Sequence, residues 1–411
     1  MRIRIVTILL FIITTVSGQD TNFKVLLDSA KTLFKKERNF SQEEIDKFDY
    51  NQVKNILNNV LKLDPNNAEA RYFLGNTYGR LNSRDGRNMT NLSPYLTIKS
   101  SEEFEKVNKL TKKYTGEIII LDPYSKISSE WGSLGMNYLY NNKRDSAIWA
   151  FKEGKKRGGF GNFILAMNRK MLDACSKNSI LITSGDNFTI PLWYLQTIEN
   201  YRKDVSVVNI SLLNSKWYPN YLAKNKIIKF GLTTQDIDTI SGVLPWSDST
   251  ITINHFSWKV KPSHSEHYIL RGDKIFLSLL KQNNFEKDIF FTLGFVESSR
   301  LGLGDYLSSQ IVIDKLTPQE KLKSDFIEYY NSIIKLLKLS INVNVNSHDE
   351  LESLDYIRYS VFDELKMHLY GNEKTKAKRL LNLLDKYTNE NKYPYKQDAK
   401  KYLDYMREYL K

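Results

Sequence analysis

A short polar motif, Gly185-Asp186-Asn187, follows the apolar run of residues 179–184. If that run is a strand and a helix follows it, the motif lies where α/β sheets bind ligands and where a helix presents free N–H groups. Gly185 permits a positive φ or close approach of a ligand to the backbone. Carboxylate and amide groups hydrogen-bond sugar hydroxyls, and nearby aromatic rings offer an apolar platform. The candidate ligand-binding residues are Gly185, Asp186, Asn187, Thr189, Trp193 and Tyr194.

The same residue types have a purely structural explanation. Asp186, Asn187 or Thr189 can cap the following helix, while the aromatic residues fill the core. A third alternative is catalytic, with Asp186 as an acid, a base or a ligand-orienting group of a glycan-active enzyme. Glycoside chemistry would place a second carboxylate within ~5–10 Å of it. The residue types leave these alternatives open.

Other candidate chemistry is sparse. His264 and His267 stand three residues apart and could ligate zinc, but the sequence supplies no third ligand. Cys175 is the only cysteine, so an internal disulfide is excluded, and we interpret it as a small buried hydrophobic residue. Neither a G-x-S-x-G elbow nor a Walker loop is present. We therefore assign no catalytic residue, no metal and no cofactor.

The elements that must position the motif have an α/β pattern between residues 158 and 316. Residues 179–184 and 204–211 are typical of buried strands, and residues 190–202 have helical spacing. Strand, turn, helix and strand within ~35 residues indicate a βαβ unit, which implies a parallel sheet. Further along we predict a helix at 269–282, a strand at 288–293 and an edge strand at 310–316. The expected fold is α/β with a small parallel, Rossmann-like sheet.

Helical repeats are predicted on both sides of this domain. The tetratricopeptide pattern W-x2-L-G-x2-Y, then A-x3-F, is matched by Trp131, Leu134, Gly135, Tyr138, Ala147 and Phe151. An upstream copy has Leu74, Gly75 and Tyr78, with Arg71 in the tryptophan position. We interpret residues 81–100 as an insertion and 102–114 as the displaced second helix. In the helical C-terminal region, a degenerate hairpin is indicated by Gly371, Ala377, Leu381, Leu384 and Pro394.

The N-terminus has the three parts of a secretory signal peptide. Arg2 and Arg4 precede the apolar run 5–16, and small residues precede Gln19. An apolar run of this length is short for a bilayer, which needs ~20 residues. We expect cleavage after residue 18 and a soluble, extracytoplasmic mature chain (periplasmic or secreted) without stable membrane insertion.

The formal charge of +13 does not indicate a nucleic-acid partner. The lysines are spread along the chain, and no basic motif has aromatic residues at a base-stacking spacing. Lysine, asparagine, isoleucine and tyrosine are abundant together, which is the pattern of an AT-rich coding sequence. We expect no nucleic-acid binding.

The run from Ile180 to Gln196, with Arg202-Lys203-Asp204-Val205 and Asn209-Ile210-Ser211-Leu212-Leu213, carries a family resemblance. It resembles the soluble C-terminal region of large multi-spanning membrane proteins related to protein O-mannosyltransferases, a family of unknown function. That family has a Gly-Asp-Asn-Asp-Thr-Phe-Pro-Leu-Trp-Tyr-Leu-Gln-like signature. Here Phe188 replaces the second aspartate, and the membrane-spanning portion that would hold the sugar-transfer chemistry is missing. The resemblance covers about residues 160–316 and implies no transferase activity for this chain.

The sequence thus predicts four segments: a signal peptide (1–18), tetratricopeptide-like repeats (19–157), an α/β domain (158–316) and a helical C-terminal region (317–411). The function that we expect is that of an exported interaction protein. Its repeats would bind a protein partner, and its α/β domain would bind a glycan or glycoprotein. The alternative is an extracytoplasmic glycan-active enzyme, a hydrolase or transferase accessory, that uses Asp186.

Overall fold

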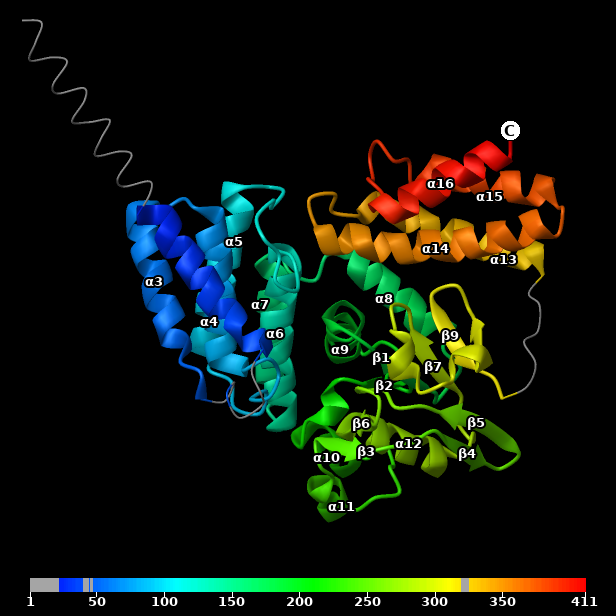
Figure 1. Ribbon diagram of the computed structural model, residues 1–411, viewed down its shortest axis with the longest axis horizontal. Coiled ribbons are helices and arrows are strands. Elements are labelled where there is room, and N and C mark those ends of the chain that lie inside the picture. Colours follow the sequence, from blue (N-terminus) through cyan, green and yellow to red (C-terminus); the bar gives the residue numbers. More distant parts are fainter. Residues whose placement is uncertain (1–21, 40–43, 45–46, 319–324) are drawn as a thin grey trace, which may run out of the picture. The chain divides into compact units, whose positions relative to one another are not determined.

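The computed structural model describes residues 22–39, 44, 47–318 and 325–411, so the predicted signal peptide lies outside the described residues. The chain forms two compact units (Figure 1). The first contains the described residues up to Asn141 together with Glu153–Gly159, and the second contains Asn142–Lys152 with the described residues from Phe160 onward. Helix α7 (Arg144–Lys156) contributes to both. Among the described residues, none of the helices combines the length and the apolar character that crossing a bilayer requires.

The first unit is built from helices that pack on their neighbours along the chain. A helix at residues 22–35 is followed by η1 (Lys36–Asn39), α3 (Tyr50–Leu63), α4 (Ala68–Ser83), α5 (Pro94–Leu110) and α6 (Pro123–Tyr140). Helix α3 packs on α4, α4 on α5, and α5 on α6. Asn67, Ser93 and Asp122 cap three of these helices, because each side chain accepts a hydrogen bond from a first-turn N–H.

Close packing of these helices depends on the residues that the repeat pattern singled out. A Cβ on Gly75 would lie 2.9 Å from the ring of Phe104, so only glycine allows α4 and α5 to approach this closely. The Ser100 hydroxyl donates to the Gly75 carbonyl at 2.8 Å. Trp131, in α6, is fully buried, and its indole N–H donates to the Ser101 hydroxyl at 2.9 Å. Helical hairpins are therefore present between α4 and α5 and between α5 and α6.

The predicted insertion is shorter than expected. Helix α4 runs on to Ser83 and α5 begins at Pro94, so the prediction of an insertion at 81–100 and a helix at 102–114 was wrong. Ser93 caps α5, and Pro94 occupies its first turn, where a missing N–H costs nothing. The side chain of Asn82 accepts a hydrogen bond from the N–H of Ser93 and donates one to its C=O. These bonds hold the start of α5 beside the end of α4, so the connection between the two helices takes only about ten residues.

The second unit contains a five-stranded sheet with the order β2-β1-β7-β9-β8. The chain runs through α8 (Asn162–Ala174), β1 (Ile180–Thr183), η2 (Asp186–Phe188), α9 (Ile190–Ile198), β2 (Ser206–Asn209), β7 (Ile289–Thr292), β8 (Leu307–Ser309) and β9 (Ile313–Leu316). Strands β2, β1 and β7 are parallel, as the βαβ pattern predicts. Strand β9 is antiparallel to both β7 and β8, so the sheet is mixed and β8, not β9, is its edge. The turn at residues 310–312 is too short for the crossover that parallel pairing would need.

The elements between β2 and β8 include two further pairs of strands. Besides β7, this part of the chain contains η3 (Leu212–Asn214), α10 (Trp217–Lys224), α11 (Thr234–Thr239), β3 (Val243–Pro245), β4 (Ser249–Ile253), β5 (Phe256–Val260), β6 (Tyr268–Leu270), α12 (Arg271–Asn283), η4 (Glu297–Arg300) and η5 (Gly304–Tyr306). Strand β3 pairs with β6, and β4 with β5, both antiparallel. The predicted helix at 269–282 begins at Arg271, after the short strand β6.

The C-terminal helices belong to the same unit as the sheet. They are α13 (Phe326–Leu337), η6 (Lys338–Asn342), α14 (His348–Tyr370), α15 (Lys374–Tyr387) and α16 (Gln397–Tyr409). Helices α14 and α15 form a hairpin, in which Ala377 and Leu384 are buried. Arg358, on α14, is also fully buried and pairs with Asp355 at 2.8 Å. Its guanidinium donates to the carbonyls of Thr388 and Tyr393, which fixes the α15–α16 connection on α14.

Candidate functional site

The Gly185 motif lies directly after β1, at the carboxyl end of the three parallel strands. Gly185 has a φ of 77°, a conformation that favours glycine. A Cβ built there would meet no atom within 4 Å, so the backbone conformation and not a lack of space calls for glycine. The motif forms η2, and Asp186 accepts a backbone hydrogen bond from the Thr189 N–H at 3.2 Å.

The Thr189 hydroxyl stabilises this turn from inside the protein. It donates to the Gly185 carbonyl at 2.8 Å and accepts from the Asn209 amide at 2.8 Å. With its one proton used in this way, it accepts from the Thr183 hydroxyl, which lies 2.7 Å away. All three side chains are buried, and they join β1, the turn and β2. The Thr189 side chain makes no capping bond to α9. Its hydroxyl is therefore neither a helix cap nor available to a ligand.

Asp186 and Asn187 lie nearer the surface. Asp186 is exposed and Asn187 is half-buried. The carbonyl of Asn187 accepts a hydrogen bond of 2.9 Å from the side chain of Asn168, a fully buried residue of α8. The turn is thus held on β1, β2 and α8, and it keeps Asp186 at the protein surface.

Trp193 and Tyr194 both face the interior. Trp193 is 6% exposed and its ring centroid lies 6.5 Å from that of Tyr218. Tyr194 is 8% exposed and packs against Phe160, with 4.7 Å between the ring centroids. These contacts agree with the core-filling alternative, and they leave neither ring exposed as a platform beside Asp186.

An aromatic pair occupies the crevice between β1 and β7. The strand order reverses there, because the chain passes from β1 to β2 on one side and returns to β7 on the other. Phe188, from η2, packs on Tyr356, from α14, with 5.5 Å between the ring centroids. Gly294 follows β7 with a φ of 81°, and a Cβ on it would lie 3.0 Å from the Tyr356 hydroxyl and 3.4 Å from Phe188. The crevice that often holds a substrate is therefore filled by side chains.

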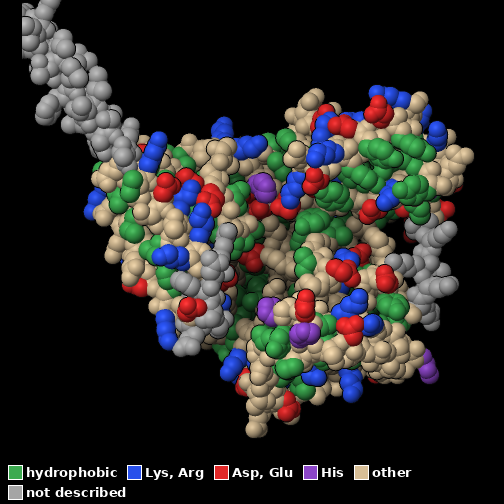
Figure 2. Space-filling view, in the orientation of Figure 1, with side chains coloured by type: hydrophobic (Ala, Val, Ile, Leu, Met, Phe, Trp, Pro, Cys, Tyr) green, Lys and Arg blue, Asp and Glu red, His purple; other side chains and the backbone are tan. Residues whose placement is uncertain are grey.

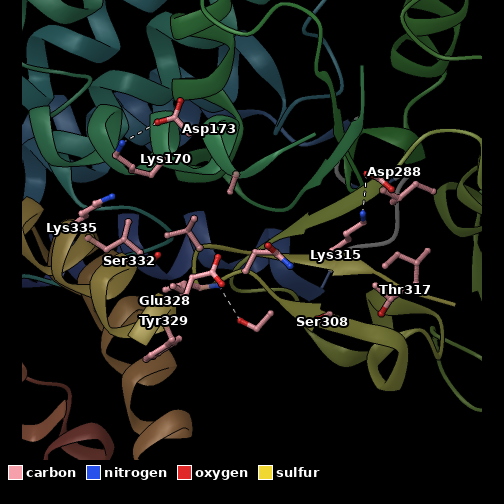
Figure 3. Close-up of a pocket in the computed structure, with 18 of the residues that line it drawn as sticks. Lys170, Asp173, Asp288, Ser308, Lys315, Thr317, Glu328, Tyr329, Ser332 and Lys335 are labelled. Atoms are coloured by element: carbon pink, nitrogen blue, oxygen red, sulfur yellow. Dashed lines mark hydrogen bonds and ion pairs between the residues drawn. The ribbon is translucent and has the colours of Figure 1, made fainter. Parts of the chain in front are cut away.

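A groove of about 1180 Å³ lies at the opposite end of the sheet, where β7 begins (Figure 3). Its walls come from α8, the start of β7, the β8–β9 hairpin and α13, and none of the candidate residues from Gly185 to Tyr194 lines it. The polar groups around it include Lys170, Asp173, Lys287, Asp288, Ser308, Ser309, Lys315, Glu328, Ser332 and Lys335. No sequence pattern indicated this groove, because its residues come from segments that are far apart in the chain.

Ion pairs occupy part of the groove wall. Lys170 pairs with Asp173 at 3.0 Å, and Lys315 pairs with Asp288 at 3.0 Å. Partial burial raises the pKa of Asp288, but hydrogen bonds from Ser176 and Lys315 outweigh this effect and hold the pKa below its ordinary value. The Asp288 carboxylate is therefore charged at neutral pH and holds Lys315 on the groove wall.

The remaining candidates for chemistry lie elsewhere. His264 and His267 are exposed, on the loop before β6. Among the described residues, a different group, His348, Asp349 and Glu352, has its potential metal-ligand atoms within 4.8 Å of one another. Glu352 already pairs with Lys396 there, so a cation would have a competitor. Cys175 is buried, and burial raises the pKa of its thiol to about 12, which makes it a poor nucleophile.

Comparison with known proteins adds one finding. A comparison with curated proteins gives no match. A family model described as TMEM260-associated domain 2 matches residues 164–227, which begin in α8 and include β1, the Gly185 turn, α9, β2 and α10. Over these residues the chain is similar to TMEM260-associated domain 2.

Proposed function

We propose that this chain is a non-catalytic interaction protein that works outside the cytoplasm. Its helical hairpins bind a protein partner, and the Asp186 turn contacts a glycan or glycoprotein. The observation that supports this proposal best is the aromatic pair of Phe188 and Tyr356 in the crevice between β1 and β7. Catalysis favours a site that encloses its substrate and excludes water. With the crevice filled, a ligand of the exposed Asp186 has to bind from the surface, as a binding module allows.

The similarity to TMEM260-associated domain 2 supports the same proposal. The matched residues contain the Gly185 turn and both strands that it joins. The sequence resemblance described above assigns sugar transfer to the membrane-spanning portion of those proteins and not to the region that this chain resembles. We infer that a region of this kind recognises a glycosylated partner, and the predicted signal peptide is the basis for placing it outside the cytoplasm.

The C-terminal hairpins offer a surface that suits a protein partner. Figure 2 shows hydrophobic side chains gathered over these helices. Tyr370, Tyr405 and Tyr409 are 81%, 61% and 51% exposed, and Tyr402 lies close enough to Tyr370 and Tyr405 to interact electrostatically with both. We call these four residues the tyrosine surface. Tyrosine is enriched in protein interfaces, because its ring supplies apolar area and its hydroxyl a hydrogen bond.

The test compares Asp186→Asn and Asp186→Ala with the wild-type chain on a glycan array, with a thermal melt of each protein. Asp186→Asn should leave the melting temperature unchanged and abolish glycan binding, because the amide keeps the shape but loses the charge and one acceptor. Glycan binding that survives in a stable Asp186→Asn protein would refute the proposed role of the turn. Glycan cleavage or transfer by the wild-type chain that is lost in Asp186→Asn would instead support the enzymatic alternative.

A further inference from the structure

The outer side of strand β8 has unpaired backbone groups. On its inner side, backbone hydrogen bonds join Tyr306 to Thr317 at 2.9 Å and Gln310 to Ile313 at 2.7 Å. Residues of an antiparallel strand alternate in the direction of their N–H and C=O groups, so Ser309 directs both groups away from β9. Within the described residues neither group has a partner. Ser309 is exposed, so β8 offers part of a sheet edge to another chain.

The groove lies beside this edge, and Ser309 lines it. The opposite wall is α13, whose residues Glu328, Ser332 and Lys335 have the spacing of one helix face. Figure 3 shows these residues across the groove from the β8–β9 hairpin. At about 1180 Å³, the groove exceeds the ~300–1,000 Å³ of typical small-molecule pockets. Its size and its place beside a sheet edge suit an extended ligand.

The charges in the groove favour an acidic ligand. Lys170 and Lys315 are paired with carboxylates of the wall. Within the described residues, Lys287 and Lys335 have no ion-pair partner, and both are exposed. Glu328 is the one groove carboxylate without such a pair in the same residues. Among the described residues, two ammonium groups and one carboxylate of the groove have no ion-pair partner, so the groove lining carries a net positive charge.

We propose that the groove binds an extended acidic segment of another polypeptide, which adds to the sheet as a strand beside β8. The backbone of that segment pairs with Ser309, and its carboxylates pair with Lys287 and Lys335. A glycan is a poorer fit, because the groove has no well-exposed aromatic platform among the described residues. Of the two aromatic residues that line it, Tyr329 is 7% exposed and its hydroxyl donates to the Ser360 carbonyl. Phe285 is half-buried and packs against Phe256, with 5.5 Å between the ring centroids. The proposal is independent of the Asp186 turn.

The test begins with selection of a random decapeptide library on the chain, followed by titration of the enriched peptides by fluorescence polarisation. We expect enrichment of Asp and Glu among β-branched residues. Ser309→Pro removes the outward N–H, at an edge position that tolerates proline, and should weaken binding about fivefold. Ser309→Ala keeps that N–H and should bind as the wild type does. N-methylation of alternate peptide residues should abolish binding in one of the two registers.

The contribution of the lysine charges to peptide binding is tested with two double variants. Lys287→Ala with Lys335→Ala should weaken peptide binding by about tenfold or more, and added salt should act in the same direction. Lys281→Ala with Lys338→Ala changes two exposed lysines that do not line the groove, and should leave binding unchanged. Thermal melts of all variants show that each is folded.

Three results would overturn the proposal. One is a selection that enriches no peptide, and another is equal binding of the selected peptides to the wild-type chain and to the folded Ser309→Pro or lysine variants. The third is tighter binding of a heparin-derived tetrasaccharide than of any selected peptide, dependent on Lys287 and Lys335 but unaffected by Ser309→Pro. That result would make the groove an anionic glycan site.

Discussion

Replacement of Trp131 by alanine tests the packing of the first unit. The side chain is fully buried, its N–H donates to Ser101, and the guanidinium of Arg157 lies 5.2 Å from the ring centroid. Truncation of a buried tryptophan costs ~3–5 kcal/mol of unfolding free energy. Ser101 keeps a hydrogen bond to Glu105 at 2.9 Å, so loss of the indole adds no unsatisfied hydroxyl. We expect the loss of unfolding free energy caused by Trp131→Ala to fall within that range.

The hydrogen bond can be separated from the packing. Ser101→Ala removes the acceptor and leaves a buried indole N–H unpaired, which costs ~1–3 kcal/mol. In the Trp131→Phe background the indole is absent, so Ser101→Ala should cost less. The difference between the two values is the coupling energy of the pair.

Urea unfolding of the full chain, followed by far-UV circular dichroism, measures these changes. The two compact units can unfold in separate transitions, so the expected loss falls on the transition of the first unit. Tyr95→Ala is the control within the first unit, because Tyr95 is 64% exposed and should cost well under half as much. Equal losses for Trp131→Ala and Tyr95→Ala would refute the helical packing described above.

Three further predictions concern the second unit. Gly185→Ala should cost ~1–3 kcal/mol, because its φ of 77° and ψ of 161° lie in a region that essentially only glycine adopts, whereas Gly242→Ala, with open space around its Cβ, should be nearly neutral in the same melt. Hydrogen bonding from Arg202 lowers the pKa of Asp204 from 3.8 to about 2, so this carboxylate stabilises the fold above pH 3.8 and loses its effect as the pH falls toward 2. The advantage of the wild type over Asp204→Asn in unfolding free energy should therefore be present at neutral pH and disappear near pH 2. Buried Cys175 should react with Ellman's reagent only after denaturation, and rapid reaction in the native state would contradict its burial.

Local patterns in the sequence predicted much of this architecture. Gly75 and Trp131 mark the helical hairpins because close helix approach needs a glycine and a large buried ring. The alternation of apolar runs with a helical segment predicted β1, α9 and β2 and their parallel pairing. The start of α5 was missed although Ser93 and Pro94 are a recognisable start signal.

Features that depend on distant residues could not be predicted in this way. Strands β3, β6 and β8 have three residues each, too short for a periodic pattern to show. Strand β9 lies within the strand predicted at 310–316, but its pairing with β8 was not predicted. The contact between Phe188 and Tyr356 joins positions far apart in the chain, so no local pattern indicates that the crevice is filled. The groove could not be predicted for the same reason, because its shape depends on where the distant helix α13 packs.

The buried network of Thr183, Thr189 and Asn209 consists of two hydroxyls and an amide. None of these groups gains or loses a proton between mildly acidic and neutral pH. Surroundings of different acidity can change the charge on a ligand, but they leave the scaffold of the turn intact. Any acid sensitivity in recognition at this turn would therefore originate in the exposed groups that meet the ligand.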